Sequence, residues 1–297
     1  MTTLAHLSDI HLAPLPRAKP RELMNKRLTG YLNWRLRRQN SLDGLRLAAL
    51  VAHLHGQAPD FTCVTGDLVN LALDAEIATA LGWLKGIGPV DKVCVSPGNH
   101  DAYLPQALEH ACEFWEGYVR GETLDESPFP YVRRIGQVAV IACSSAVPTP
   151  PFFAAGRFAK PQAARLTRIL KLLGEGDFFR VVMIHHPPNI ESQTPRAGLW
   201  GAELFREVIA ETGAEIVLHG HTHRSTIHSI PGRAGDVPVI GVAAAGTGEH
   251  PKPNDEPARY NLFRIERSGP TWTCSMTEYG YQHVGDDVTQ LLQVRIY

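Results

Sequence analysis

The sequence has few cysteines, and their positions exclude two common uses of that residue. There are five, at Cys63, Cys94, Cys112, Cys143 and Cys274. An odd number without close pairs predicts neither a disulfide framework nor a C-x-x-C metal site. Positions 63, 94 and 143 lie in apolar runs, which favours buried free thiols and a reducing compartment.

Long apolar runs and a charge excess are also missing. No apolar stretch approaches the ~20 residues that cross a bilayer, and the first residues, MTTLAH, lack the pattern of a signal peptide. We therefore expect a cytoplasmic protein. The net charge is -1 and the isoelectric point is near 6.9, whereas proteins that hold long nucleic acids usually carry a basic excess. Extended nucleic acid is not an expected partner.

Short apolar runs alternate with helical patterns, which predicts an α/β fold. Strands are expected at 3–7, 61–65, 92–96, 138–143, 180–184, 215–218, 226–230, 237–242, 260–266 and 271–279. Helices are expected at 41–55, with Ser41 as the cap, and at 74–84, 108–118, 161–173 and 202–211. The late run of strands indicates a two-sheet β-sandwich flanked by helices, within a single domain over 1–297. Residues 246–257, rich in Gly, Pro and charge, are expected to form a surface loop.

Five short polar segments follow predicted strands, where open α/β folds place their sites. They are Asp9-x-His11, Gly66-Asp67-x-x-Asn70, Gly98-Asn99-His100-Asp101, His185-His186-Pro187 and Gly220-His221-x-His223. Carboxylates and imidazoles without thiolate suit Mn, Fe, Zn or Co. Two such metals ~3.5–4 Å apart can polarise a phosphoryl group and generate hydroxide near neutral pH.

Spacing within two of these segments indicates convergence. Side chains two residues apart point the same way in extended chain, so Asp9 with His11, and His221 with His223, are each expected to meet at one locus. Each segment alone also has an ordinary explanation: Gly-Asp and Gly-Asn mark turns, and adjacent histidines often end strands. The ordered occurrence of all five favours a site.

The ordered set resembles the calcineurin-like metallophosphoesterase superfamily. The segments HLSDIHL and VSPGNHD are especially similar to its bacterial phosphodiesterase branch, and the resemblance runs from about Leu4 to His223. It implies a β-sandwich flanked by helices, a dinuclear centre of divalent or trivalent transition metals (Mn, Fe or Zn), and hydrolysis of a phosphate ester by metal-bound hydroxide.

Carried over motif by motif, the resemblance assigns a role to each site residue. The first metal would be held by Asp9, His11, Asp67 and His223. The second would be held by Asp67, Asn99, His185 and His221, with Asp67 bridging. His185 is preferred to His186 because it directly follows the strand. His100 would protonate the leaving group or stabilise the phosphoryl oxygens, and Asp101 would orient His100. Asn70 stands where the family often has Asp.

A basic segment after the first motif stands outside this pattern. Between Arg17 and Arg38 lie eight basic residues and one acidic residue, so the segment carries +7 and the rest of the chain -8. Met24, Leu28, Tyr31 and Leu32 fall near one helical face, with Trp34 at its margin. A helical insertion at about 17–40 is therefore expected to overhang the site. It could lie on an anionic membrane, dock as an ordinary helix with snorkelling side chains, or draw in anionic substrate.

These features favour a metal-dependent phosphodiesterase, acting on a lipid or nucleotide-linked substrate. A phosphomonoesterase or nucleotide phosphatase is the alternative. A nuclease is disfavoured by the near-neutral charge, and a non-catalytic scaffold by the presence of every expected ligand.

Overall fold

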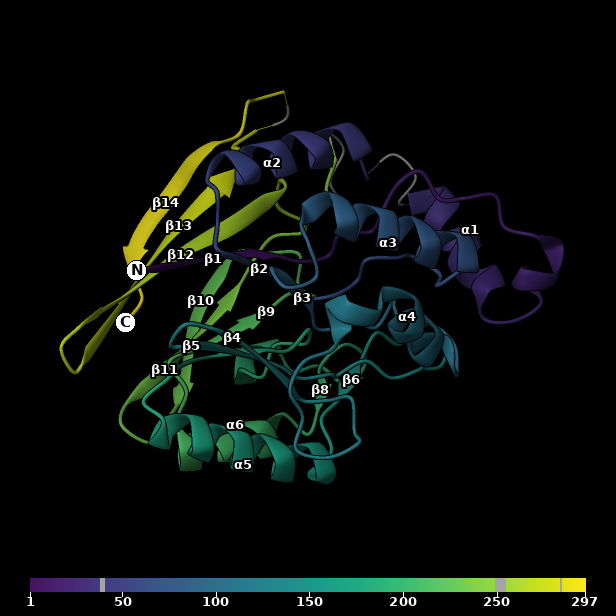
Figure 1. Cartoon of the computed structure of the whole chain (residues 1–297). Helices are drawn as coiled ribbons and strands as arrows, with labels where there is room; N and C mark the ends of the chain where they lie inside the picture. Colours follow the sequence, from purple (N-terminus) through teal and green to yellow (C-terminus); the bar gives the residue numbers. More distant parts are fainter. Residues whose placement is uncertain (38–40, 249–254, 284) are drawn as a thin grey trace.

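The computed structural model describes residues 1–37, 41–248, 255–283 and 285–297, without the side chain of Arg37 (Figure 1). Two six-stranded sheets pack face to face. The first has the order β14-β13-β12-β1-β2-β3 and the second β10-β11-β9-β7-β5-β4. The strands of the first are β1 (Thr2–Leu7), β2 (Phe61–Val64), β3 (Val93–Val95), β12 (Arg259–Ser268), β13 (Thr271–Gly280) and β14 (Thr289–Arg295). Those of the second are β4 (Tyr131–Ile135), β5 (Val138–Ala142), β7 (Phe179–Met183), β9 (Ile216–His219), β10 (Thr226–Pro231) and β11 (Asp236–Gly241).

Helices cover the outer face of each sheet (Figure 1). The first sheet is covered by α2 (Gly44–Gly56), α3 (Asp74–Ile87) and α4 (Ala107–Trp115), and the second by α5 (Lys160–Glu175) and α6 (Ala202–Thr212). The remaining elements are short: η1 (Pro20–Leu23), α1 (Arg27–Arg37), η2 (Glu116–Val119), η3 (Ile190–Ser192), β6 (Gly156–Arg157) and β8 (Leu199–Trp200). The predicted α/β fold with two packed sheets flanked by helices is confirmed.

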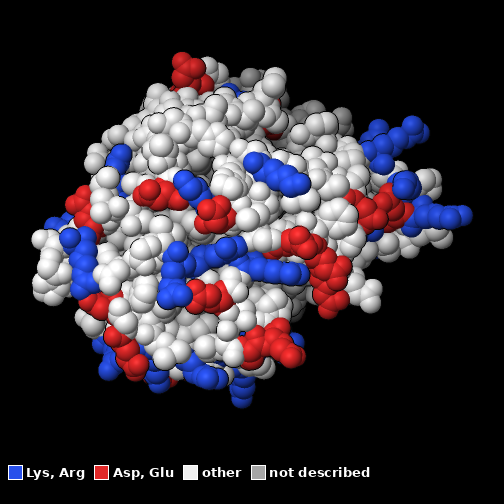
Figure 2. All heavy atoms as spheres, in the orientation of Figure 1, with Lys and Arg blue, Asp and Glu red and all other residues white. Residues whose placement is uncertain are grey.

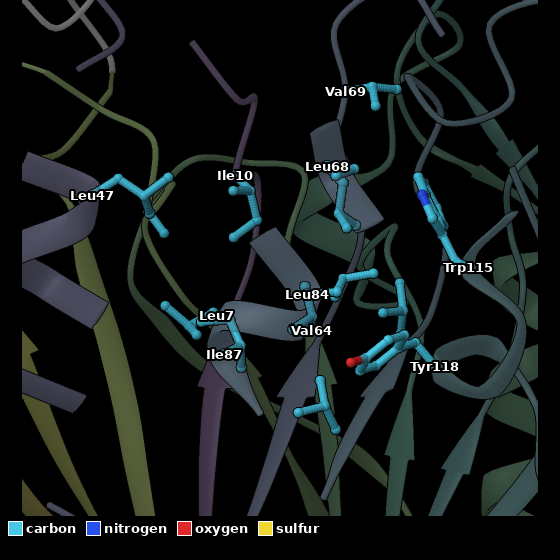
Figure 3. Packing of buried hydrophobic residues seen from close by; sticks show 14 of the residues in the cluster. Leu7, Ile10, Leu47, Val64, Leu68, Val69, Leu84, Ile87, Trp115 and Tyr118 are labelled. Carbon is cyan, nitrogen blue, oxygen red and sulfur yellow. The ribbon is translucent and has the colours of Figure 1, made fainter. Parts of the chain in front are cut away.

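Three apolar clusters hold these layers together. One lies between the sheets, where Leu4, Phe61, Phe179 and Phe263 are almost fully buried. The other two lie between each sheet and its helices. Figure 3 shows the cluster beneath the first set of helices, with Leu7 and Val64 of the sheet near Leu84 and Ile87 of α3.

The predicted strands and helices all occur, with ends shifted by a few residues. Ser41 was the wrong cap, because α2 begins later: Asp43 Oδ1 accepts the backbone N–H of Leu45 at 2.8 Å and of Arg46 at 3.3 Å. Two strands, β4 with five residues and β14 with seven, were not predicted. Both are edge strands with charged or polar side chains, so neither carries the apolar run of a central strand.

The sheet topology gathers the polar segments at one edge. β1 runs parallel to β2 and β2 to β3, and in the other sheet β5, β7 and β9 are parallel. The carboxyl ends of β1, β2, β3, β7 and β9 therefore deliver their following loops to the same end of the sandwich.

Candidate metal centre

The first group of side chains at this edge combines two carboxylates and two imidazoles. His223 Nε2 lies 3.2 Å from Asp9 Oδ1. His11 Nε2 lies 4.0 Å from the same Asp9 oxygen and 3.7 Å from Asp67 Oδ2. These four residues are those expected at the first metal. The ligand atoms of Asp9, His11 and His223 all lie within 4.8 Å of one another, and Asp67 joins them through its contact with His11.

The second group shares Asp67 with the first. Its Oδ2 lies 3.5 Å from His185 Nε2, and the His185 ring lies 5.2 Å from the ring of His221. Asp67 Oδ2 therefore faces histidines of both groups, as a bridging carboxylate would. The other oxygen, Oδ1, accepts the His100 backbone N–H at 2.8 Å, which draws the Asn99–His100 loop onto Asp67.

Gly98 makes this close approach of two loops possible. A Cβ atom at Gly98 would stand 2.2 Å from Asp67 Oδ1, so only glycine lets the loop pack there.

The two adjacent histidines differ in how their rings are held. His186 uses both nitrogens, with Nδ1 2.8 Å from Ser145 Oγ and Nε2 2.9 Å from the Ala154 carbonyl. His185 directs Nδ1 to the Thr65 carbonyl, which leaves Nε2 facing Asp67. This arrangement suits His185, and not His186, as a ligand, because a carbonyl commonly holds the second nitrogen of a metal-bound imidazole.

The donor set fits a pair of transition metals. Three buried atoms, Asp9 Oδ1, His185 Nε2 and Asn99 Oδ1, make no hydrogen bond to any residue that the structure describes. Buried polar atoms are usually satisfied, and these three are oxygen and nitrogen atoms of the kind that bind metals. Because the donors are oxygen and imidazole nitrogen, Mn, Fe and Zn all match the site.

The backbone at the candidate ligands is strained. Five of them have positive φ: Asp9 (52°), His11 (43°), Asp67 (54°), His221 (69°) and His223 (57°). Non-glycine residues rarely adopt this left-handed region, and such outliers concentrate at functional sites.

The same backbone corrects the reasoning from strand alternation. β1 ends at Leu7 and β9 at His219, so the two polar pairs lie in turns beyond the strands. Asp9 and His11 do converge. His221 and His223 instead point to different groups, with His221 beside His185 and His223 beside Asp9.

Burial and neighbouring charges set the protonation states of the candidate ligands. Burial raises the pKa of Asp67, but the neighbouring His185 and His100 outweigh it and hold that pKa well below its usual range. Burial lowers the pKa of His185, and the Asp67 carboxylate more than reverses this, to about 9. Burial lowers the pKa of His221 to about 3, so that ring is neutral and ready to coordinate.

His100 lies at the edge of the first group, and its ring is oriented differently from expectation. Its Nδ1 lies 2.6 Å from the Asn70 carbonyl, which fixes a proton on Nδ1. Asp101 was expected to orient this ring. Its carboxylate instead accepts backbone N–H groups, including those of Asp67 at 2.9 Å and Gly98 at 2.8 Å. Asp101 thereby joins the loops that follow β2 and β3.

Two supporting residues were missed in the sequence. Glu76, three residues into α3, accepts the backbone N–H groups of Asn70 at 2.7 Å and Leu71 at 3.0 Å, and so holds the loop that orients His100. Its capping position was a readable signal. Asp255 Oδ2 lies 3.2 Å from His223 Nδ1. Asp255 belongs to the expected surface loop, of which residues 249–254 lie outside the described part, and no sequence signal connects it with His223.

Comparison with known proteins identifies a family and a fold. The sequence model of one family, described as calcineurin-like phosphoesterase, matches residues 2–225. A search of curated protein sequences gave no significant match.

Solved structures share the fold at low sequence identity. A dimetal phosphatase from Danio rerio has a TM-score of 0.64 and 13% identity over 99% of this chain and 98% of that one. A purple acid phosphatase from yellow lupin seeds has a TM-score of 0.56 and 10% identity, over 97% of this chain and 53% of that one. A Haemophilus influenzae NAD nucleotidase has a TM-score of 0.51 and 11% identity, over 99% of this chain and 49% of that one. These structures show the fold alone.

Proposed function

Because the chain belongs to the calcineurin-like phosphoesterase family, we propose that it is a phosphodiesterase with a dinuclear metal centre. The observation that carries the proposal is the convergence of Asp and His side chains from five strand-end loops, two of them (Asp9 and His185) with unsatisfied buried ligand atoms. The diesterase preference rests on the similarity of HLSDIHL and VSPGNHD to the bacterial phosphodiesterase branch.

The proposed ligand assignment follows the two groups. Asp9, His11, Asp67 and His223 hold one metal, and Asp67, Asn99, His185 and His221 hold the other. A bound pair supplies Lewis-acid polarisation of the phosphoryl group and an activated water for in-line attack.

His100 is the proposed general acid. The Asn70 carbonyl accepts from Nδ1 at 2.6 Å, so in the doubly protonated ring Nε2 carries the second proton, and this is the proton that passes to the leaving oxygen. The His11 ring lies edge-on at 4.8 Å, so His100 stands directly beside the first metal group.

Turnover on small diesters and monoesters tests the proposal. We expect the Mn-loaded protein to hydrolyse bis-p-nitrophenyl phosphate faster than p-nitrophenyl phosphate. A reversed preference would assign the monoesterase alternative, and a protein that holds two metals but turns over neither substrate would overturn the proposal.

We further propose peripheral contact with the anionic inner surface of the membrane through η1 and α1. No helix in the described part of the chain is long and apolar enough to cross a bilayer. The outer face of this segment exposes Met24 (83%), Leu28 (48%), Leu32 (51%) and Leu36 (82%). Basic side chains project at the same end of the molecule (Figure 2). The exposed ones described there are Arg17, Lys19, Arg21 and Arg35.

Other basic residues of the segment serve to attach it to the protein. Arg27 Nε donates to the Leu71 carbonyl at 2.9 Å, and Lys26 Nζ donates to the Thr149 carbonyl at 2.7 Å. The membrane proposal therefore rests on the outer residues. Each Lys or Arg near an anionic surface contributes ~1 kcal/mol, so three would matter.

Vesicle binding separates a membrane face from a structural helix. Leu28→Ser with Leu32→Ser should reduce sedimentation with phosphatidylserine vesicles and hydrolysis of a labelled phospholipid, and leave bis-p-nitrophenyl phosphate turnover unchanged. Leu172→Ser is the matched control, because Leu172 is 57% exposed on the distant α5. If neither wild type nor variant binds anionic vesicles at low salt, the membrane proposal is wrong.

A further inference from the structure

A cavity of about 240 Å³ lies between α1 and the candidate metal centre. One wall contains Asn99 and His100, and the opposite wall contains Lys26, Gly30 and Trp34. Four larger cavities of about 320, 440, 580 and 610 Å³ are lined by none of the candidate metal ligands. The smaller cavity is therefore the one placed to receive part of a substrate whose phosphate lies at the metals.

Four aromatic side chains lie in the lining, among polar ones. Trp34, Tyr103, Phe152 and Phe153 all contribute. Phe152 is 85% exposed, which is unusual for so large an apolar side chain and leaves its ring at the cavity with little of its surface covered. The three better covered rings, those of Trp34, Tyr103 and Phe153, favour a flat, apolar-faced occupant.

Trp34 adds a polar requirement. Its side chain is 9% exposed, and its Nε1 donor has no hydrogen-bond partner among the described residues. Buried indole N–H groups usually find a partner. This atom is not itself accessible from the cavity, so an acceptor atom of an occupant would complete it after a small shift of the indole ring.

The wall formed by α1 is held firmly in place. Gly30 lies inside the helix, where glycine is normally unfavourable. A Cβ atom there would stand 2.0 Å from the Tyr103 hydroxyl and 2.7 Å from Leu71 Cδ2, so glycine permits the helix to pack directly on the cavity. Lys26 also lies 4.4 Å above the Tyr103 ring while bonded to Thr149. The cavity is thus preformed.

We propose that this cavity is a subsite that binds a planar aromatic group, carrying a hydrogen-bond acceptor, attached to the phosphate at the metal centre. The inference rests on the proposed function for the position of that phosphate. The cavity volume of about 240 Å³ falls below the ~300–1,000 Å³ of pockets that bury drug-sized ligands, so the cavity suits a ring system and not acyl chains. An aryl ester and a nucleobase both supply this chemistry.

Non-hydrolysable phosphonates test the subsite without turnover. Isothermal titration of the metal-loaded protein compares methyl-, cyclohexyl-, phenyl- and 4-pyridylphosphonate, with adenosine 5′-phosphonate as the nucleobase arm. Stacking of bases on aromatic side chains corresponds to roughly 5- to 150-fold in affinity. We expect phenylphosphonate to bind at least about fivefold more tightly than the methyl and cyclohexyl compounds, and the pyridyl compound more tightly still. Preference for the adenosine compound over the pyridyl one assigns the nucleobase source, and the reverse assigns an aryl source.

Two variants connect the preference with the cavity. Trp34→Phe keeps a ring and removes the N–H, so it should abolish the advantage of pyridyl over phenyl. Tyr103→Leu should reduce the phenyl advantage over methyl. Trp200→Phe is the control, because the Trp200 N–H already faces the Pro195 carbonyl at 3.4 Å and lies outside the cavity.

The outcomes distinguish this inference from the proposed function. Equal affinity for methyl- and phenylphosphonate, or binding of none of the compounds, would overturn the subsite even if diesters were hydrolysed. A ring preference lost in Trp34→Phe or Tyr103→Leu would support the subsite even in a protein without diesterase turnover.

Discussion

Removing the carboxylate of Asp255 should weaken metal binding although Asp255 is not itself a proposed ligand. His223 lies between two carboxylates, with Nδ1 3.2 Å from Asp255 Oδ2 and Nε2 3.2 Å from Asp9 Oδ1. The contact with Asp255 holds the proton on Nδ1 and turns Nε2 toward the metal position. The pair is largely buried, with His223 12% and Asp255 16% exposed. Solvent therefore screens it less than a surface pair.

The expected loss of metal affinity follows from the contact between Asp255 and His223. Loss of the partner that orients a metal-bound histidine typically costs ~10–100-fold in metal affinity, or about 1.4–2.8 kcal/mol. Asp255→Ala should show the full loss. Asp255→Asn should show less, because its amide oxygen still accepts from Nδ1. The neighbouring backbone should persist in both, since the Glu256 N–H donates to the His223 carbonyl at 3.2 Å.

Competition with a chromophoric chelator measures the affinity of each of the two metals. Asp286→Ala is a matched control, because Asp286 pairs with His283 at a similar 3.3 Å, but that pair is 42% and 75% exposed and outside the metal groups. Only the Asp255 variants should bind one metal more weakly. If Asp255→Ala binds both metals as tightly as wild type, Asp255 does not position His223.

Three further predictions address catalysis, protonation and packing. His100→Ala should keep two metals and lose ~10²–10⁴-fold in turnover, whereas Asp67→Ala should lose both metals. If His100→Ala hydrolyses a substrate with a poor leaving group at the wild-type kcat, the role proposed for His100 is wrong. Metal affinity should rise with pH between 6 and 9, by up to about tenfold per pH unit, because metals bind neutral imidazole and His185, whose pKa is about 9, must release a proton. Chelator competition at several pH values measures this dependence. An affinity that does not change with pH would contradict the coupling. Gly82→Ala should raise the free energy of unfolding by up to ~1 kcal/mol, since Gly82 is helical with open space around it. Gly30→Ala should lower the free energy of unfolding by ~1–2 kcal/mol, because the added methyl group overpacks the contact with Tyr103. Urea unfolding measures both variants, and equal effects would contradict the close packing of α1.

The sequence predicts most of the metal centre because strand ends are local features. An apolar run followed by Asp or His identifies both the strand and the residue that leaves it. Parallel packing then brings Asp9, Asp67 and Asn99 to one edge of the first sheet. What the sequence does not reveal is the local backbone. The left-handed φ values of His221 and His223 separate two side chains that extended chain would have kept together.

Long-range support is the part that sequence patterns miss. Asp255 meets His223 across 32 residues, within a stretch whose composition indicates only a surface loop. Asp101 follows the proposed general acid directly in sequence, yet its carboxylate accepts backbone N–H groups of the preceding motif, such as that of Leu68 at 2.9 Å. Contacts of this kind depend on how loops cross in space, which periodicity and residue type do not encode.

The basic segment shows what an amphipathic pattern leaves open. Its leucines mark one face of the helix without saying whether that face packs on the protein. Leu28 and Leu32 are half exposed, whereas Trp34, at the margin of the pattern, is buried. The reason is Gly30, which lets the polar side of α1 dock on Tyr103. Docking by that side turns the leucines outward, and it also places Trp34 over the cavity. Membrane contact and recognition of the substrate ring are therefore assigned to opposite faces of one helix, so substitutions at Leu28 and at Trp34 should separate vesicle binding from phosphonate binding within the same protein.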